Sequence, residues 1–264
     1  MNLTDMTGKA GLVTGAGYGI GRGSARHLAS LGAQVAVIDR DVERGHETVD
    51  MIAADGGPEA LFLEADVSDE EQVAHAVAAT VAAFGRLDFA HNNAAISPVT
   101  GNTVECSLEH WDAILSVNLT GLWLCMKHEI PQMVSSGGGA IVNTSSGVGL
   151  LGMSHQPAYV ASKHGIIGVT KAAALEFAAA GVRVNAICPG PVLTGLTEQG
   201  LLDGKYTLDT LASLNPMKKV AYPDDISGAV AWLCSDASAF VTGVALPVDG
   251  GTVAGLPSFR PPAA

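Results

Sequence analysis

The segment AGLVTGAGYGIGRGSARHLASLG, residues 10–32, carries the strongest structural signal in the chain. A short apolar run at 10–14 leads directly into a glycine-rich turn, and a helix-forming run closed by Gly32 follows it. Such a turn leaves backbone N–H groups free at the positive end of a helix dipole, where a pyrophosphate can bind. The segment therefore predicts a strand–turn–helix unit that binds a dinucleotide. The turn residues expected to contact this ligand are Gly15, Gly17, Tyr18, Gly19, Ile20 and Gly21.

A second strand-like run, residues 33–41, places Asp39 about 20 residues beyond the turn. A carboxylate at this point can accept hydrogen bonds from the adenosine ribose hydroxyls, and it would repel a 2′-phosphate. Asp39 therefore favours NAD(H) over NADP(H). Arg40 leaves an alternative open, because an arginine beside the site could neutralise a phosphate or could be a solvated surface charge.

Strand-like and helix-like segments alternate about six times along the chain, with no linker and no shift in composition. This pattern is typical of an α/β fold. It predicts one domain over 1–264, a Rossmann-like doubly wound parallel sheet of about seven strands with helices on both faces.

Polar residues follow several of these strands. Asp66 and Val67 end the run at 61–67 and are expected to flank an adenine ring, although Asp66 could also belong to the start of the next helix. Asn93 ends a further strand at the carboxyl edge of the sheet, where ligands bind in such folds. Asn118 lies within the helical stretch 107–133, where an asparagine disfavours the helix and needs a reason, such as a satisfied core amide or a kink.

The net charge of the 264-residue chain is −12, which makes nucleic acid and anionic membranes unfavourable partners. No apolar run approaches the roughly 20 residues of a membrane span, and the N-terminal residues do not resemble a secretory signal. The four cysteines form no CxxC pair and are interpreted as reduced thiols. We expect a cytoplasmic protein without a membrane partner.

Tyr159 and Lys163 open a helical run with four-residue spacing, which puts the phenol and the ammonium on one face. A free phenol has a pKa of roughly 10 and is a poor base at neutral pH. The lysine and a second positive charge could lower this pKa toward 7, so that Tyr159 becomes a general acid/base. The pair Ser145-Ser146 closes a strand-like run about 13 residues upstream of the tyrosine.

With these residues in hand, the chain resembles the short-chain dehydrogenase/reductase family, in its compact single-domain branch. The resemblance covers about residues 6–252 and rests on TGAGYGIG at 14–21, Asp39, DV at 66–67, NNAA at 92–95, Asn118, Ser146, YVASK at 159–163 and PGPVLT at 189–194. One departure is Ala95, where the family usually has glycine. A methyl group there could narrow the wall near the cofactor or change a backbone angle.

The resemblance implies roles for particular residues. Tyr159 would exchange the proton of the reacting oxygen, while Lys163 would lower the phenol pKa and bind the nicotinamide ribose. Ser146, rather than Ser145, would position the reacting oxygen, and Asn118 would hold a water that relays protons from Lys163. The remaining cofactor contacts implied are Pro189, Gly190, Val192 and Thr194, and no metal is required.

The substrate implied is an alcohol or ketone, and NNAA at 92–95 together with YVASKH at 159–164 resembles dehydrogenases of cyclic diols and alcohols. Its pocket would comprise Ile96-Ser97-Pro98, the segment Gly147 to His155, and a lid at about 193–220. The lid leucines (Leu196, Leu201, Leu202, Leu208, Leu211 and Leu214) favour an uncharged, moderately hydrophobic molecule, whereas His155 is expected to remain a surface residue. The tail at about 255–264 is poor in core residues and is expected to be frayed or to pack on a neighbour.

Family relatives commonly form homotetramers, arranged as dimers of dimers, and two long helices with apolar residues on several faces suit such an assembly. The alternatives are a non-catalytic nucleotide-binding relative, an NADP-dependent ketone reductase, and another reaction on the same frame. Epimerase relatives are usually longer, and the enoyl-reductase branch spaces its tyrosine and lysine more widely. We therefore predict an NAD-dependent oxidoreductase acting on a secondary alcohol and its ketone.

Overall fold

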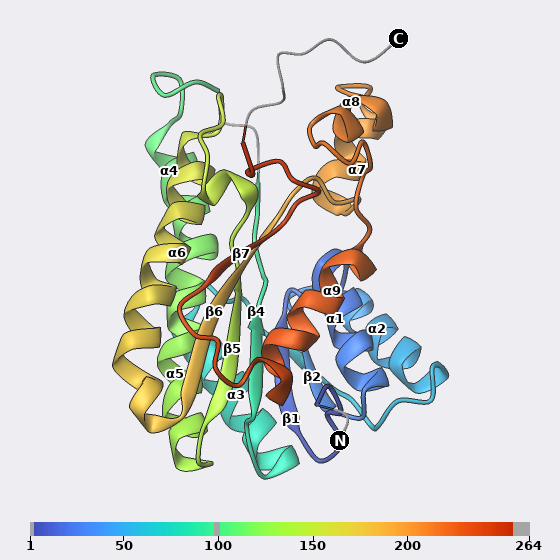
Figure 1. Cartoon of the computed structure of the whole chain (residues 1–264), viewed down its shortest axis with the longest axis vertical. Coiled ribbons are helices and arrows are strands. Elements are labelled where there is room, and N and C mark those ends of the chain that lie inside the picture. Colours follow the sequence, from blue (N-terminus) through green and yellow to red (C-terminus); the bar gives the residue numbers. More distant parts are fainter. Residues whose placement is uncertain (1–2, 98–100, 256–264) are drawn as a thin grey trace.

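The computed structural model describes residues 3–97 and 101–255, which contain a seven-stranded parallel sheet with the order β3-β2-β1-β4-β5-β6-β7 (Figure 1). The strands are β1 (Ala10–Thr14), β2 (Gln34–Asp39), β3 (Leu61–Glu64), β4 (Phe89–Asn92), β5 (Gly139–Thr144), β6 (Val182–Pro189) and β7 (Ala245–Val248). The central strands are almost entirely buried and rich in Val, Ile and Ala, as expected for a parallel sheet covered on both faces. The expected fold class is confirmed.

Helices cover both faces of the sheet. The α-helices are α1 (Gly19–Ser30), α2 (Val42–Ala54), α3 (Glu70–Phe84), α4 (Leu108–Leu115), α5 (Leu122–Ser135), α6 (Pro157–Phe177), α7 (Gly195–Leu202), α8 (Leu208–Ser213) and α9 (Pro223–Cys234). In Figure 1, α1, α2 and α9 lie on one side, and α3, α5 and α6 lie on the other. Each layer packs on the sheet through its own buried cluster, around Leu28 and Val230 on one face and around Met126 and Ile166 on the other.

The strand order reverses between β1 and β4, which are hydrogen-bonded neighbours. From β1 the chain proceeds outward to β2 and β3, and from β4 it proceeds in the opposite direction to β7. In open α/β sheets, such a switch point leaves a crevice beyond the carboxyl ends of the strands. The glycine-rich turn follows β1 and Asn93 follows β4, so both lie at this crevice.

Two expected elements differ from those observed. The helix expected at 107–133 is split by a π-helical segment, Ser116–Gly121, that contains Asn118. The strand expected at 61–67 ends at Glu64, which pairs with Asp39 at the end of β2. The backbone N–H of Ala65 still donates to the carbonyl of Asp39. Asp66 therefore lies in the connection that follows the strand.

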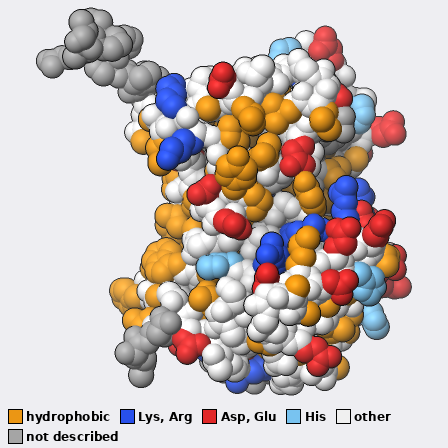
Figure 2. Space-filling model, turned by 90° about the vertical axis from the view of Figure 1, so that its right-hand side faces the viewer, with side chains coloured by type: hydrophobic (Ala, Val, Ile, Leu, Met, Phe, Trp, Pro, Cys, Tyr) orange, Lys and Arg blue, Asp and Glu red, His pale blue; other side chains and the backbone are white. Residues whose placement is uncertain are grey.

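The predicted lid at 193–220 contains the two short helices α7 and α8, which lie beyond the carboxyl edge of the sheet (Figure 1). Figure 2 shows the face that includes these helices, with a group of hydrophobic side chains in its upper half and charges of both signs distributed over the whole face. The predicted tail, apart from Gly255, and Pro98 lie outside the described residues. Within the described part of the chain, the helices are too short or too polar to cross a membrane.

Candidate active site

The glycine-rich turn has the geometry of an anion cradle. Gly15 and Gly19 have φ values of 62° and 56°, in the left-handed region that favours glycine. A Cβ at Gly21 would overlap the carbonyl oxygen of Gly15, so the helix can approach the turn only without a side chain there. Tyr18 is the N-cap residue of helix α1, but its side chain makes no capping hydrogen bond, and the first turn of the helix has no acidic residue. Its first N–H groups are therefore available to a phosphate.

Asp39 is held rigidly beside this turn. Its Oδ2 accepts a hydrogen bond from the backbone N–H of Gly17 at 2.7 Å, and its Oδ1 accepts one from that of Asp41 at 2.9 Å. A Cβ at Gly17 would lie 2.8 Å from Oδ2, which explains the glycine. The carboxylate thus faces the nucleotide end of the crevice in a fixed orientation.

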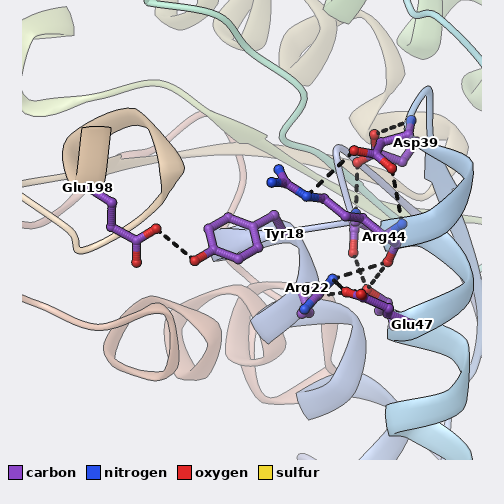
Figure 3. A network of polar contacts seen from close by, with 10 residues as sticks. Tyr18, Arg22, Asp39, Arg44, Glu47 and Glu198 are labelled. Atoms are coloured by element: carbon purple, nitrogen blue, oxygen red, sulfur yellow. Dashed lines mark hydrogen bonds and ion pairs between the residues drawn. The ribbon is translucent and has the colours of Figure 1, made fainter. Parts of the chain in front are cut away.

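Charged and aromatic side chains surround this end of the crevice (Figure 3). The guanidinium groups of Arg22 and Arg44 lie 5.4 Å and 5.1 Å from the centroid of the Tyr18 ring. The Tyr18 hydroxyl donates to Oε2 of Glu198 at 2.7 Å, which joins the turn to α7 of the predicted lid. This bond to the carboxylate is the main reason that the pKa of Tyr18 is raised.

Asn93 braces the glycine-rich turn from the neighbouring strand. Its Nδ2 donates to the carbonyl oxygens of Thr14 and Gly15 at 3.2 Å each, and its backbone N–H donates to Oγ1 of Thr14 at 2.9 Å. Asp66 is engaged differently, because its Oδ1 accepts from the backbone and the hydroxyl of Ser68. Asp69, and not Asp66, caps α3, while the backbone N–H of Asp66 donates to Oε1 of Gln72 in that helix.

The first turns of α6 present Tyr159 and Lys163 to the same space. Helix α6 starts with Pro157 at its N-terminus, and the four-residue spacing aligns the two side chains along one face. The Nζ of Lys163 lies 5.5 Å from the centroid of the Tyr159 ring and donates to the carbonyl oxygen of Thr144 at 2.9 Å. Lys163 is only 2% exposed, so this carbonyl at the end of β5 fixes the ammonium.

Burial shifts the pKa values of both Lys163 and Tyr159. Burial lowers the pKa of Lys163 to about 8, because the charged ammonium loses hydration. Burial also raises the pKa of the Tyr159 phenol, and the Ser146 hydroxyl acts in the opposite direction by hydrogen bonding. In the protein alone, desolvation outweighs the neighbouring polar groups. The expected lowering of the tyrosine pKa involves a second positive charge besides Lys163, so it stays a prediction.

The two serines that follow β5, Ser145 and Ser146, make different contacts. The Ser145 hydroxyl donates to the backbone carbonyl of Lys163 at 2.8 Å and so ties the strand to α6. Ser146 has an extended backbone, and its Oγ accepts from the N–H of Val148 at 3.3 Å while facing the cavity. The Ser146 hydroxyl thus lies at the cavity and within hydrogen-bonding reach of the Tyr159 phenol.

Asn118 connects the π-helical segment to the loop after β4. Its Oδ1 accepts from the backbone N–H of Ile96 at 2.8 Å, and its Nδ2 donates to the carbonyl of Ile96 at 2.9 Å. Its Nδ2 also lies 3.4 Å from the hydroxyl of Ser162 on α6. The side chain is thus a satisfied core amide at a helix irregularity, as the sequence suggested, and both ends of the amide hold the loop.

These groups open on one cavity of about 1410 Å³ at the carboxyl edge of the sheet. The predicted residues that line it are Gly15, Tyr18, Gly19, Ile20, Asp39, Arg40, Asp66, Val67, Asn93, Ser146, Tyr159, Lys163, Pro189, Gly190, Val192 and Thr194. Gly17, Gly21 and Asn118 do not line it and support its walls instead. Among the described residues, no cluster of three His, Cys, Asp or Glu side chains is arranged to hold a metal ion.

Several wall residues were not identified from the sequence. Gln156 precedes Tyr159 by three residues, so helical spacing could have indicated it. Arg44 lies in α2, after the strand that ends at Asp39, and helical spacing does not relate these two residues. Glu198 reaches Tyr18 across 180 residues, and nothing in the local sequence signals that contact.

The substrate end of the cavity differs in detail from the expectation. Leu202, Leu211 and Leu214 line it, whereas Leu201 and Leu208 do not. His155 is exposed and also lies off the cavity wall, in agreement with its expected surface role.

Ala95 lies on the cavity wall, and its φ is outside the left-handed region. Its methyl group therefore narrows the cavity at this point without backbone strain.

Comparison with known proteins gives consistent matches over nearly the whole chain. A family model described as "Enoyl-(Acyl carrier protein) reductase" matches residues 15–253. A short chain dehydrogenase/reductase of Aspergillus oryzae is 43% identical over 93% of this chain and 95% of its own. A 2,5-dichloro-2,5-cyclohexadiene-1,4-diol dehydrogenase of Sphingobium indicum is 41% identical over 96% of this chain and 100% of its own. The crystal structure of levodione reductase superposes with a TM-score of 0.91 at 34% identity, covering 95% of this chain and 100% of that one.

Proposed function

Because the chain belongs to the short-chain dehydrogenase/reductase family, we propose that it is an NAD(H)-dependent oxidoreductase that interconverts a secondary, cyclic alcohol and its ketone. The observation that carries this proposal is that Ser146, Tyr159 and Lys163 share one cavity with the glycine-rich turn. The similar diol dehydrogenase and levodione reductase both have names that refer to cyclic oxygenated compounds, which supports the cyclic substrate.

The residues present fit a dinucleotide. The uncapped start of α1 and the left-handed glycines suit a pyrophosphate, and the fixed Asp39 carboxylate suits two ribose hydroxyls. Val192 and Thr194 also line the cavity, with Thr194 close to Gly19 of the turn, and are proposed to hold the carboxamide of the nicotinamide. The family uses NAD(P)(H), and the coenzyme supplies or accepts the hydride when bound.

The chain's own residues handle the proton and orient the substrate. Tyr159 exchanges a proton with the reacting oxygen through its phenol, which is the step of general acid/base catalysis. The Ser146 hydroxyl, which is beside the phenol, is proposed to donate to the same oxygen and fix its position. Lys163 places a positive charge beside the phenol and is proposed to bind the nicotinamide ribose. Asn118 supports the wall through Ile96 and is proposed to assist proton relay from Lys163.

Replacing Asp39 by asparagine should shift the coenzyme preference. We expect the ratio of kcat/KM for NAD to kcat/KM for NADP to fall about 10- to 100-fold, because a charge that repels the 2′-phosphate is removed at short range. Steady-state kinetics with both coenzymes measure this ratio. The matched control is Asp41→Asn, since Asp41 is a neighbouring carboxylate that caps α2 and does not line the cavity. A wild-type enzyme that clearly prefers NADP(H) would contradict the proposed role of Asp39.

The variant Lys163→Met should lose both catalytic rate and coenzyme affinity. Methionine fills a similar volume but removes the buried charge, so we expect kcat to fall about 100-fold and the Kd of NADH to rise several-fold. Fluorescence titration of NADH separates the two effects. Lys171→Met is the control, because Lys171 is exposed on the same helix. If the Kd of NADH were unchanged, Lys163 would have no part in coenzyme binding.

Three alternatives are less well supported. The family model has the description of an enoyl reductase, but that branch spaces its tyrosine and lysine more widely than the four residues found here. A non-catalytic nucleotide-binding role does not account for Ser146, Tyr159 and Lys163 meeting at one cavity. NADP-dependent ketone reduction would require Arg40 to outweigh Asp39.

We also propose a homotetramer, arranged as a dimer of dimers, and a cytoplasmic location. Large apolar side chains stand exposed on the outer helices, with Trp123 of α5 47% exposed and Leu175 of α6 86% exposed. Burial of such residues between subunits is favourable. Sedimentation equilibrium at micromolar concentration should give the tetramer mass, and a monomer mass would refute the assembly.

A further inference from the structure

The substrate end of the cavity carries a polar pair that the proposed mechanism does not use. Ser97 follows β4, Gln156 precedes α6, and both line the cavity. The Ser97 hydroxyl donates to Oε1 of Gln156 at 3.3 Å. This contact joins two segments 59 residues apart in the sequence and fixes the orientation of the glutamine amide.

The amide of this cavity-lining glutamine keeps a donor group without a partner among the described residues. With Oε1 engaged by Ser97, the Nε2 of Gln156 has two N–H groups that make no hydrogen bond to the described part of the chain. Gln156 occupies the N-cap position of α6 but makes no side-chain capping bond. The side chain is therefore not required to start the helix, and its amide is free to bind a ligand.

Gln156 lies one helical turn from the reacting centre. It precedes Tyr159 by three residues, and residues at this spacing share a helix face with Cβ atoms about 5–6 Å apart. An oxygen bound at Gln156 would therefore be separated from the oxygen at Tyr159 by roughly a helical turn. This separation suits oxygens at opposite ends of a six-membered ring.

The surroundings of the pair select a neutral molecule. Its neighbours on the cavity wall include the apolar side chains of Ile96, Leu151 and Met153. The ammonium of Lys205, also on the wall, is paired with Asp203 at 2.9 Å. A hydroxyl or carbonyl group therefore fits this end of the cavity better than a carboxylate.

We propose that Gln156 is a specificity-determining residue that donates a hydrogen bond to a second oxygen of the substrate, held in orientation by Ser97. The substrate class is then a ring oxygenated at two positions, a cyclic 1,4-diol or the corresponding hydroxyketone. This inference rests on the proposed function, because it takes Tyr159 as the group that meets the first oxygen.

The test compares substrates that differ in the second oxygen. Wild-type protein should oxidise cyclohexane-1,4-diol with a kcat/KM at least about tenfold above that of cyclohexanol, because the monoalcohol leaves the amide unpaired. In Gln156→Leu this selectivity ratio should fall about 10- to 100-fold. Gln132→Leu makes the same change on α5, away from the cavity, and should keep the wild-type ratio.

A second variant keeps the side chain at position 156 polar and tests the direction of the hydrogen bond. Gln156→Glu presents a carboxylate, which accepts but does not donate. It should therefore still oxidise the diol, whose second hydroxyl can donate to the carboxylate. It should lose most activity in the oxidation of 4-hydroxycyclohexanone, whose second oxygen is a carbonyl and can only accept. Binding of NADH and the melting temperature of each variant report whether the fold is intact.

The outcomes separate this inference from the proposed function. If wild-type protein oxidises cyclohexanol and the diol equally well and Gln156→Leu leaves their ratio unchanged, the inference is wrong and the proposed function stands. If NADH binds but neither alcohol is oxidised, the proposed substrate class fails and the inference fails with it. A fall in the ratio in Gln156→Leu, and not in Gln132→Leu, supports the assignment.

Discussion

Tyr159→Phe should lower kcat by about 10³- to 10⁴-fold while the Kd of NADH changes by less than about twofold. The substitution removes only the phenolic oxygen, which is the proposed proton donor and acceptor, and general acid/base groups contribute up to about 10⁴-fold. The aromatic ring remains, together with its contact at 5.5 Å to Nζ of Lys163. The ammonium also keeps its hydrogen bond to Thr144, so the coenzyme side of the cavity is preserved.

The measurements for Tyr159→Phe are single-turnover kinetics and NADH titration on the same preparation. Tyr222→Phe is the control, because it removes the same atom from a tyrosine that is 59% exposed and lies off the cavity. The pH profile adds a second readout. Because the phenolate is the form that accepts the proton of an alcohol, oxidation by wild-type enzyme should accelerate with rising pH, and the residual activity of the variant should not. A variant with more than a tenth of wild-type turnover would remove the tyrosine from the mechanism.

The sequence was sufficient for the fold because its signals are local. Alternating apolar strands and helices predict a parallel sheet, and glycines such as Gly15 and Gly21 are needed where the backbone turns or approaches closely. The position of Asp39 at a strand end likewise follows from spacing along the chain. Residues whose function depends on a strand end or a helix face could therefore be placed at the cavity from the sequence alone.

Features that depend on contacts between distant segments could not be predicted. The π-helical segment around Asn118 accompanies hydrogen bonds to Ile96, and no helix propensity reports such a partner. The contact between Tyr18 and Glu198 crosses from the turn to α7. The pKa of Tyr159 depends on how completely the fold buries it, which spacing does not reveal.

Glu129 of α5 is a buried acid that the proposed mechanism does not use. Its side chain is fully buried, and its Oε2 accepts from Nδ2 of Asn92 at 3.0 Å. Its Oε1 and the Oδ1 of Asn92 have no partner among the described residues, although both are acceptors. Burial raises the pKa of Glu129 to about 8, and a proton on the carboxyl group would supply the donor that this pair of acceptors needs.

This buried acid should make the free energy of unfolding fall as pH rises. In the unfolded chain Glu129 ionises near its ordinary pKa of 4.5, whereas in the folded protein it stays protonated up to about 8. Between these values the unfolded state binds fewer protons, so stability decreases with increasing pH and levels off above about 8. The shift corresponds to a total loss of about 3–5 kcal/mol.

Glu129→Gln should remove this dependence, because glutamine is neutral at every pH and can still accept from Asn92. At pH 5 wild type and variant should differ by no more than about 2 kcal/mol, since both side chains are then neutral. By pH 8.5 the variant should have gained about 3–5 kcal/mol relative to wild type. Urea unfolding at a series of pH values measures the difference, with Glu176→Gln as the control, because Glu176 is exposed on α6. A difference between wild type and Glu129→Gln that stays constant with pH would show that Glu129 is ionised in the folded protein at neutral pH.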